Sequence, residues 1–331
     1  MDNLKDDTSM QRPHVVLLGA GASRAACPDG DAVGKPVPLM NDLVRVLGLE
    51  HEVPSGLDAS DFESLYGALK ADPNYADQCD QIEHAIHEYF AALSLPDIPT
   101  VYDYLVLALR EKDVIATFNW DPFLLQAAQR CYRARTRPPQ LVFLHGNVAI
   151  GSCVGDRREG PIGTRCSRCR KPFSPSQLLY PIAEKNYRDD PQIAAAWSYV
   201  QNAFQCAFMV TIFGYSAPQS DAAAIDLLRT AWGSSAAREL EQFEIIDIRD
   251  PEALRATWDE FIHTDHYDIY DDFFASSLAR HPRRTGEAYW RQHMEAQWVH
   301  PNPAPRHVGL DELRRWHIPL HDVELNRARE R

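Results

Sequence analysis

Residues 14–24 constrain the fold of this chain more than any other segment. After His14 comes the apolar run Val-Val-Leu-Leu, followed by Gly19-Ala-Gly-Ala-Ser23, and such a run is typical of a buried strand in a parallel sheet. Glycines after a strand allow a tight turn and close approach of a ligand, and the N–H groups that open the next helix favour an anion. The segment therefore predicts a strand, a phosphate-binding loop and a helix, with a dinucleotide pyrophosphate as the expected ligand.

The rest of the chain continues an alternation of strands and helices. Because the loop lacks the third glycine of the usual dinucleotide fingerprint, a glycine-rich connection without a ligand remains an alternative. Alternation of this kind predicts an α/β fold, a Rossmann-like parallel sheet with helices on both faces. The expected strands are 14–18, 113–117, 141–144, 207–213 and 243–248, and the expected helices include 80–93, 100–111, 121–131, 190–205 and 219–231.

Chemically capable residues follow four of these strands. Ligands of open parallel sheets bind outside the carboxyl ends of the strands, so the residues at those ends carry the most information about function. They are the glycine loop, Asn119 and Asp121, His145, and the segment Gly214-Tyr-Ser216 followed by Asp221. Their common position predicts a single active site at this edge of the sheet.

Each of these groups also has a structural interpretation. Asp121 precedes a helix that begins near Pro122, so it is either a site residue or an N-cap, whereas Asn119 is expected to point across the strand ends. His145 is suited to a general base, and the alternative is a half-buried histidine bonded to the backbone. The segment from Gly214 contacts phosphate or ribose, or else it is only a turn and a helix cap.

The seven cysteines indicate free thiols or a metal site, because an odd number without a secretion signal does not suit a disulfide framework. Cys166 and Cys169 have the spacing of a zinc knuckle, and Cys153 is a candidate third ligand. A fourth ligand would come from Cys206 or a histidine, or would be absent, and loop thiols without zinc remain the alternative. The remaining cysteines are expected in the hydrophobic core: Cys27, Cys79 and Cys131.

Composition limits the partners that this chain can have. Its formal net charge of −13 makes generic nucleic-acid binding unfavourable. No apolar run is long enough to cross a membrane, and the polar, acidic start is unlike a targeting peptide, so we expect a soluble cytoplasmic protein.

The chain is expected to divide into three parts. Residues 1–12 are predicted to be a disordered leader, residues 13–262 the catalytic domain, and residues 263–331 a helical extension without strands. Two inserts interrupt the catalytic domain: a helical insert at about 38–112 and a cysteine-containing insert at about 150–185.

In their order along the chain, these motifs resemble the sirtuin (silent-information-regulator-like) superfamily, and most closely its bacterial sirtuin-like branch of antiphage defence. The resemblance covers about residues 13–262 and includes the Lys185-x-Tyr187 and Ala196-Trp197 stretches. The segments that carry it are Gly19-Ala-Gly-Ala-Ser23, Thr117-Phe-Asn119-Trp-Asp121, Leu144-His145-Gly146 and Phe213-Gly-Tyr-Ser216-Ala-Pro-Gln-Ser-Asp221.

The resemblance implies an NAD-binding domain with a small helical and zinc-module lobe. It implies that Asn119 and Asp121 surround the nicotinamide ribose and that His145 is the catalytic base. The residues implied to hold the rest of NAD are Gly19, Ala20, Gly21 and Ser23 for the diphosphate, Gly214 and Ser216 for phosphate and ribose on the adenosine side, and Asp247 for the adenosine ribose.

Two departures from the protein deacetylases bear on the expected reaction. Residues 24–40 contain no counterpart of the deacetylase Asp-Phe-Arg segment, and the chain has one Cys-x-x-Cys pair where deacetylases have two. The expected function is therefore NAD hydrolysis to nicotinamide and ADP-ribose by a regulated defence enzyme. The alternatives are an NAD-dependent deacylase or ADP-ribosyltransferase, and a non-catalytic sensor of NAD or ADP-ribose. A homo-oligomer and a defence-system partner protein are also expected.

Overall fold

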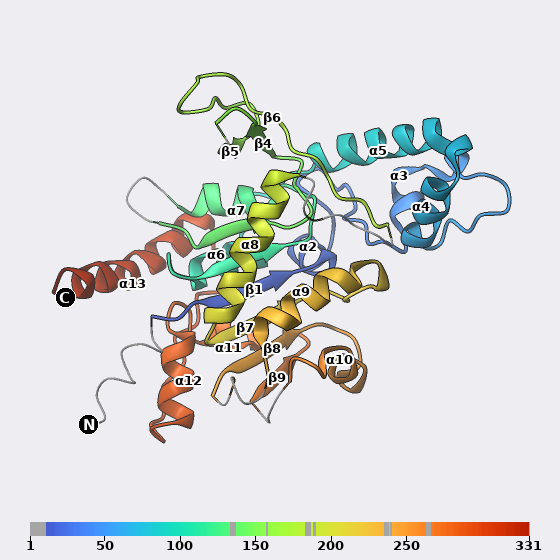
Figure 1. Ribbon diagram of the computed structural model, residues 1–331. Helices are drawn as coiled ribbons and strands as arrows, with labels where there is room; N and C mark the ends of the chain where they lie inside the picture. Colours follow the sequence, from blue (N-terminus) through green and yellow to red (C-terminus); the bar gives the residue numbers. More distant parts are fainter. Residues whose placement is uncertain are drawn as a thin grey trace.

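The computed structural model describes residues 11–330 except 133–136, 157, 183–186, 188–189, 235–237, 239 and 263–265. Its centre is a six-stranded sheet of parallel neighbours in the order β3-β2-β1-β7-β8-β9 (Figure 1). The order reverses at β1, which is the strand arrangement of dinucleotide-binding α/β folds. The strands are β1 (His14–Leu18), β2 (Val114–Thr117), β3 (Gln140–Phe143), β7 (Met209–Phe213), β8 (Gln242–Ile246) and β9 (Tyr267–Tyr270).

Helices cover both faces of this sheet. Val15 and Leu17 of β1 pack into one core with α8 (Pro191–Cys206), α9 (Ala222–Trp232) and α10 (Pro251–Trp258). Val16 and Leu18 pack into a second core with α2 (Ala20–Ala26), α6 (Val101–Ala108) and α7 (Phe123–Cys131). Because both faces are buried, the central strands β1 and β7 are mostly apolar, and the predicted fold class is confirmed.

Acidic N-caps determine where several helices begin. The side chains of Asp190 and Asp250 each accept hydrogen bonds from two backbone N–H groups in the first turns of α8 and α10. A proline follows each cap at the first helical position, where its missing N–H costs nothing. The start of α6 is instead a capping box between Thr100 and Asp103.

The sixth strand, β9, corrects the prediction that the chain has no strand beyond residue 262. It pairs in parallel with β8 at the edge of the sheet, so the sheet extends past the expected boundary at residue 262. Its residues Tyr-Asp-Ile-Tyr are exposed or only half buried. An edge strand of this kind lacks the continuous apolar run by which the other strands were predicted.

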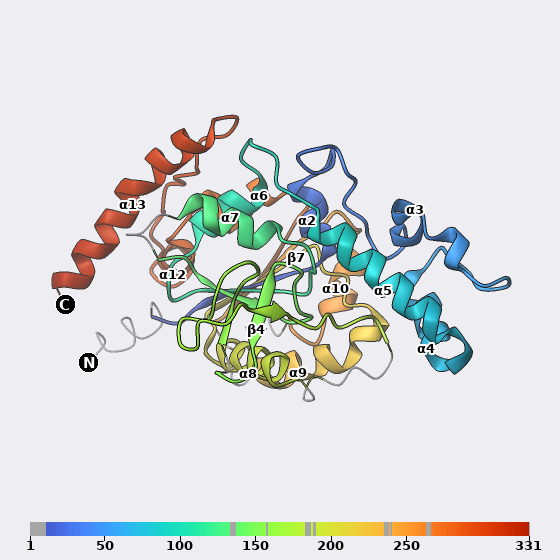
Figure 2. The same cartoon turned by 90° about the horizontal axis from the view of Figure 1, so that it is seen from above.

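The predicted insert at 38–112 contains two kinds of structure. A helical lobe projects to one side of the sheet (Figures 1 and 2). The last helix of the insert, α6, belongs instead to the layer that covers the sheet, where it packs against α7. The lobe consists of α3 (Leu43–Leu47), α4 (Phe62–Ala71) and α5 (Ala76–Ala91), with short 3-10 turns at Glu50–Glu52 and Pro73–Tyr75.

A small antiparallel sheet forms the cysteine-containing insert. Its order is β5-β4-β6, with β4 (Ile150–Cys153), β5 (Arg158–Pro161) and β6 (Ser174–Pro175). The module stands apart from the main sheet (Figure 1).

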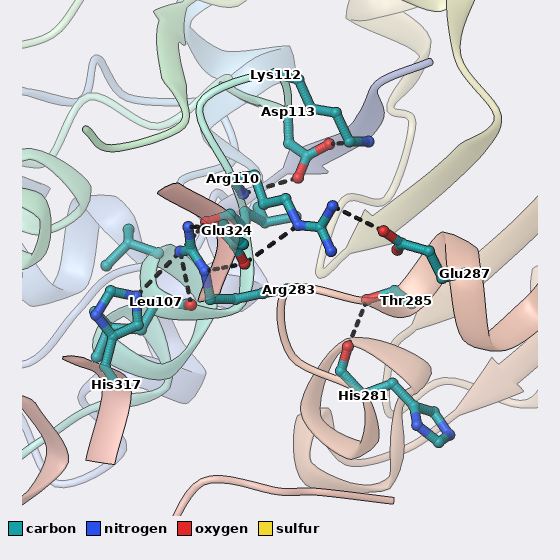
Figure 3. Close-up of polar contacts among 12 residues, drawn as sticks. Leu107, Arg110, Lys112, Asp113, His281, Arg283, Thr285, Glu287, His317 and Glu324 are labelled. Carbon is teal, nitrogen blue, oxygen red and sulfur yellow. Dashed lines mark hydrogen bonds and ion pairs between the residues drawn. The ribbon is translucent and has the colours of Figure 1, made fainter. Parts of the chain in front are cut away.

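The C-terminal helix α13 (Leu310–Glu330) is anchored at the amino-terminal edge of the sheet. Figure 3 shows Arg283 donating to the carboxylate of Glu324 at 2.6 and 2.8 Å and to Nε2 of His317 at 3.0 Å, both on α13. Arg110, which follows α6, also pairs with Glu324, at 3.4 Å. Between β9 and α13 lie a 3-10 turn (Phe273–Ala275), α11 (Ser277–Arg280) and α12 (Thr285–His293).

Within the described residues, no helix has the length and apolarity needed to cross a membrane. Residues 1–10 of the leader predicted for residues 1–12 lie outside the described residues. Lys185 lies outside them too.

Candidate active site

The glycine loop after β1 lies against the loop after β7, on either side of the reversal in strand order. The amide of Gly19 donates to the carbonyl of Phe213 at 3.0 Å, and the amide of Gly21 donates to the carbonyl of Gly214 at 2.9 Å. A Cβ atom at Gly19 would lie 2.5 Å from the Gly214 oxygen, and one at Gly214, whose φ is +60°, would lie 2.3 Å from the Ala22 nitrogen. The contact between the two loops therefore requires glycine at these positions, and it uses two amides that the sequence had suggested for an anion.

Asn119 points across the strand ends, at the glycine loop. Its Nδ2 lies 2.8 Å from the carbonyl of Gly19, 2.9 Å from Oγ of Ser23 and 3.2 Å from the hydroxyl of Tyr102. Ser23 in turn donates to Oδ2 of Asp121 at 2.6 Å. We call Ser23, Tyr102, Asn119 and Asp121 the asparagine cluster. All four are buried, and their side chains connect α2, α6 and the segment between β2 and α7.

Asp121 lies directly before α7 and contacts both that helix and Ser23. Its Oδ1 accepts the Phe123 amide at 3.1 Å and its Oδ2 accepts from Ser23, while the N-cap position of α7 is occupied by Pro122, without a side-chain cap hydrogen bond. Burial raises the pKa of the Asp121 carboxyl to about 6, against the opposing effect of these hydrogen bonds. A carboxylate in such a place interacts strongly with any nearby positive charge.

His145 lies in a second group at the same edge, which we call the histidine cluster: His145, Asp221 and Tyr215. Nε2 of His145 is 3.7 Å from Oδ1 of Asp221, and the Tyr215 hydroxyl donates to Oδ2 of Asp221 at 2.8 Å. All three side chains are buried. The ring of Phe118, next to Asn119 in the chain, stacks on Tyr215 at 4.2 Å and meets His145 edge-on at 4.7 Å. Phe118 therefore lies between the two clusters.

No sequence pattern predicted a role for Asn147, which links the segments that follow β2 and β3. Its Nδ2 donates to the carbonyl of Asp121 at 2.6 Å, and the side chain is 1% exposed. The only available signal was its position two residues after His145. The contact between Asp221 and His145 could not be predicted from local patterns, because it joins loops 76 positions apart in the chain.

The remaining predicted ligand-binding residues lie close to the carboxyl ends of β1, β7 and β8. Ser216 is exposed directly after the contact loop, and Asp247 follows β8. The Asp247 carboxylate accepts from Arg249 at 2.9 and 3.1 Å, and Arg249 also reaches the carbonyl of Tyr215 at 3.3 Å. Ala20 opens α2 inside the glycine loop.

The three cysteines predicted as metal ligands come together in the small sheet, with Asp156 as a fourth group. Sγ of Cys153 is 3.4 Å from Sγ of Cys169, and Oδ2 of Asp156 is 3.2 Å from Sγ of Cys166. The four donor atoms all lie within 4.8 Å of one another. Donors around a tetrahedral zinc ion are about 3.8 Å apart, so this group fits zinc.

Asp156 takes the position for which the sequence had suggested Cys206, a histidine or no ligand. Within the described residues, Cys206 is exposed at the end of α8 and lies outside this group. The other three cysteines are buried as predicted: Cys27, Cys79 and Cys131.

No protein-family model and no curated protein matches the sequence. Solved structures similar to this chain include a Sir2 homologue in complex with NAD, at 14% identity and a TM-score of 0.41 over 97% of this chain and 95% of that chain. A structure described as the basis for the mechanism and regulation of Sir2 enzymes has 13% identity, a TM-score of 0.39 and coverage of 97% and 99%. A Sir2 homologue mutant with ADP-ribose has 12% identity, a TM-score of 0.37 and coverage of 97% and 98%.

These three structures are described as Sir2 homologues or Sir2 enzymes. Likeness at these identities and TM-scores carries no residue roles, which depend on the contacts described above.

Proposed function

We propose that this chain is an NAD glycohydrolase, which breaks the bond between nicotinamide and ribose and releases nicotinamide and ADP-ribose. One observation carries the proposal: a glycine loop, an amide and an imidazole from three different strands gather where the strand order reverses. This is the position at which open α/β sheets bind nucleotides. The motif resemblance supports NAD as the nucleotide.

The proposed reaction replaces nicotinamide by water at the anomeric carbon of the ribose. Nicotinamide leaves with the electron pair of the glycosidic bond, so positive charge develops on the ribose. A water oxygen forms the new bond, and its proton passes to His145, which we assign as the general base. The ionised carboxylate of Asp121 is suited to stabilising the positive charge, because it is buried.

Asn119 is assigned the task of orienting the ribose or the attacking water. The contacts of its Nδ2 with Gly19, Ser23 and Tyr102 fix the plane of the amide. Since Nδ2 donates to these groups, the amide presents its carbonyl oxygen as a fixed acceptor, which needs no reorganisation during the reaction.

The burial of these groups supports a regulated enzyme. Asn119 is 8% exposed and His145 is 5% exposed. Two described residues contact His145: the Leu179 amide donates to its carbonyl at 2.9 Å, and the Tyr187 ring stacks near its ring, with 6.1 Å between the ring centroids. Because the two groups are buried, we propose that a trigger or partner of a defence system controls activity by changing their exposure. A homo-oligomer remains part of the proposal.

The test is nicotinamide release from NAD by the purified protein and by Asn119→Ala and His145→Ala. We expect both variants to lose at least about a hundredfold in rate while remaining folded. Matched controls are Asn74→Ala and His84→Ala, which change exposed residues of the helical lobe and should keep wild-type rates. Wild-type rates in both site variants would reject the site assignment.

Adding an acetylated peptide separates the other reactions from hydrolysis. A hydrolase releases nicotinamide without a peptide, a deacylase requires one, and an ADP-ribosyltransferase leaves ADP-ribose on protein. Tight NAD binding without turnover under any activating condition would favour the sensor instead.

A further inference from the structure

Asp221 approaches His145 from the opposite half of the sheet. His145 follows β3, on one side of β1, whereas Asp221 ends the 3-10 turn Gln219–Asp221 after β7, on the other side. The separation of 3.7 Å between Nε2 and Oδ1 is that of an ion pair and is longer than a hydrogen bond. In unliganded sites such contacts are often long and tighten when substrate binds.

The orientation of the Asp221 carboxylate is fixed by its hydrogen bonds and by the packing of Tyr215. Its Oδ2 is held by the Tyr215 hydroxyl at 2.8 Å, and its backbone amide donates to the carbonyl of Pro218 at 2.9 Å. The Tyr215 ring packs against the rings of Phe118 and Trp258, with centroid distances of 4.2 and 6.1 Å. With one oxygen held, the other is directed to His145.

We propose that Asp221 is the positioning residue of His145: it favours the tautomer with hydrogen on Nε2 and stabilises the imidazolium that forms when the other nitrogen accepts a proton. A carboxylate beside a catalytic imidazole has this effect in general, because it interacts more strongly with the charged ring than with the neutral one. The catalytic part of this inference rests on the proposed function, whereas the contact that sets the tautomer does not.

A purely structural role for Asp221 predicts different effects of the variants. If Asp221 served only to anchor Tyr215, then Tyr215→Phe would disturb the protein as much as Asp221→Asn, and neither would alter the His145 ring. Asp221→Asn keeps the size of the side chain and an acceptor for Tyr215 but removes the charge that faces His145. Asp226→Asn is the matched control, because Asp226 is an exposed carboxylate on α9.

The experiment measures the His145 ring directly and NAD cleavage separately. In protein with 15N-labelled histidine, the His145 signals are assigned by their loss in His145→Gln, and their shifts report the tautomer. We expect Nε2–H in the wild type, Asp226→Asn and Tyr215→Phe, and a shift toward Nδ1–H in Asp221→Asn. For cleavage we expect Asp221→Asn to lower kcat by about 10²- to 10⁴-fold with KM within about threefold, Tyr215→Phe to lose less, and Asp221→Glu to recover part of the rate.

The two readouts separate failure of this inference from failure of the proposed function. An unchanged His145 tautomer in Asp221→Asn overturns the inference, whatever the enzyme assay shows. An equal loss of kcat in Asp221→Asn and Tyr215→Phe also overturns it. If the wild type does not cleave NAD but the tautomer shifts in Asp221→Asn, the positioning contact stands and the glycohydrolase proposal fails.

Discussion

The amide of Gly21 donates a 2.9 Å hydrogen bond to the carbonyl of Gly214, which joins the first strand's loop to that of β7. These loops lie on the two sides of the reversal in strand order. Backbone therefore meets backbone at the centre of the candidate site, and the glycines that suggested a phosphate loop are also needed for this packing.

Gly19→Ala tests how much stability this loop contact provides. The new Cβ would lie 2.5 Å from both the Gly214 oxygen and the Tyr215 Cα, so the two backbones must separate. We expect the free energy of unfolding in urea to fall by about 1–3 kcal/mol. Gly67→Ala is the control: it is on helix α4 with open space around it, and it should stabilise the protein by about 0.5–1 kcal/mol. Equal stability of Gly19→Ala and the wild type would contradict the packing argument.

The inner strands of the main sheet could be predicted because they are buried on both faces and most of their residues are therefore apolar. The same physical reason explains the failure at β9, whose residues Tyr-Asp-Ile-Tyr are half buried or exposed and form no continuous apolar run. Edge strands carry too weak a pattern to be distinguished from loops.

The candidate site could be predicted only in part. Strand order places Asn119 and His145 at one edge once the strands are known, so their common location follows from local patterns. The side chains that these residues contact could not be predicted from the same patterns. Asp221 meets His145, and Ser23 meets Asp121, through loops distant in sequence whose conformations depend on packing.

Asp156→Cys tests whether Asp156 is the fourth metal ligand. With three thiolates and one carboxylate, cobalt in the wild-type site should show sulfur-to-cobalt charge-transfer absorption for three thiolates. We expect this absorption per cobalt to rise by about a third in Asp156→Cys, and zinc affinity to fall at least about tenfold in Asp156→Ala. Glu159→Gln, an exposed change in the same small sheet, should leave both unchanged. A wild-type zinc affinity in Asp156→Ala would remove Asp156 from the ligand set.

Glu244→Gln should remove a pH dependence of folding stability. Glu244 is fully buried on β8, and burial raises its pKa from 4.5 to about 7 although it accepts from Thr211 and Ser277. The folded state therefore binds this proton more tightly than the unfolded state. The associated stability is present below pH 4.5 and is lost as pH rises through 7.

The shift corresponds to about 3 kcal/mol. We therefore expect Glu244→Gln to gain about that much relative to the wild type between pH 4.5 and pH 8, measured by urea unfolding. Glu260→Gln, an exposed change on the surface, should track the wild type across this range. A constant difference between Glu244→Gln and the wild type would show that Glu244 does not titrate in this interval.

Glu324→Ala should loosen the C-terminal helix from the sheet. Glu324 holds Arg283, whose side chain is 2% exposed and also donates to the carbonyl of Leu109 at 2.7 Å. Removing the carboxylate leaves a buried guanidinium without its charge partner, so we expect unfolding to become easier by about 1.5–3 kcal/mol. Asp311→Ala breaks an exposed pair with Arg314 on the same helix and should cost less than about 1 kcal/mol. Equal effects of the two changes on urea unfolding would mean that burial of Arg283 does not decide the strength of this anchor.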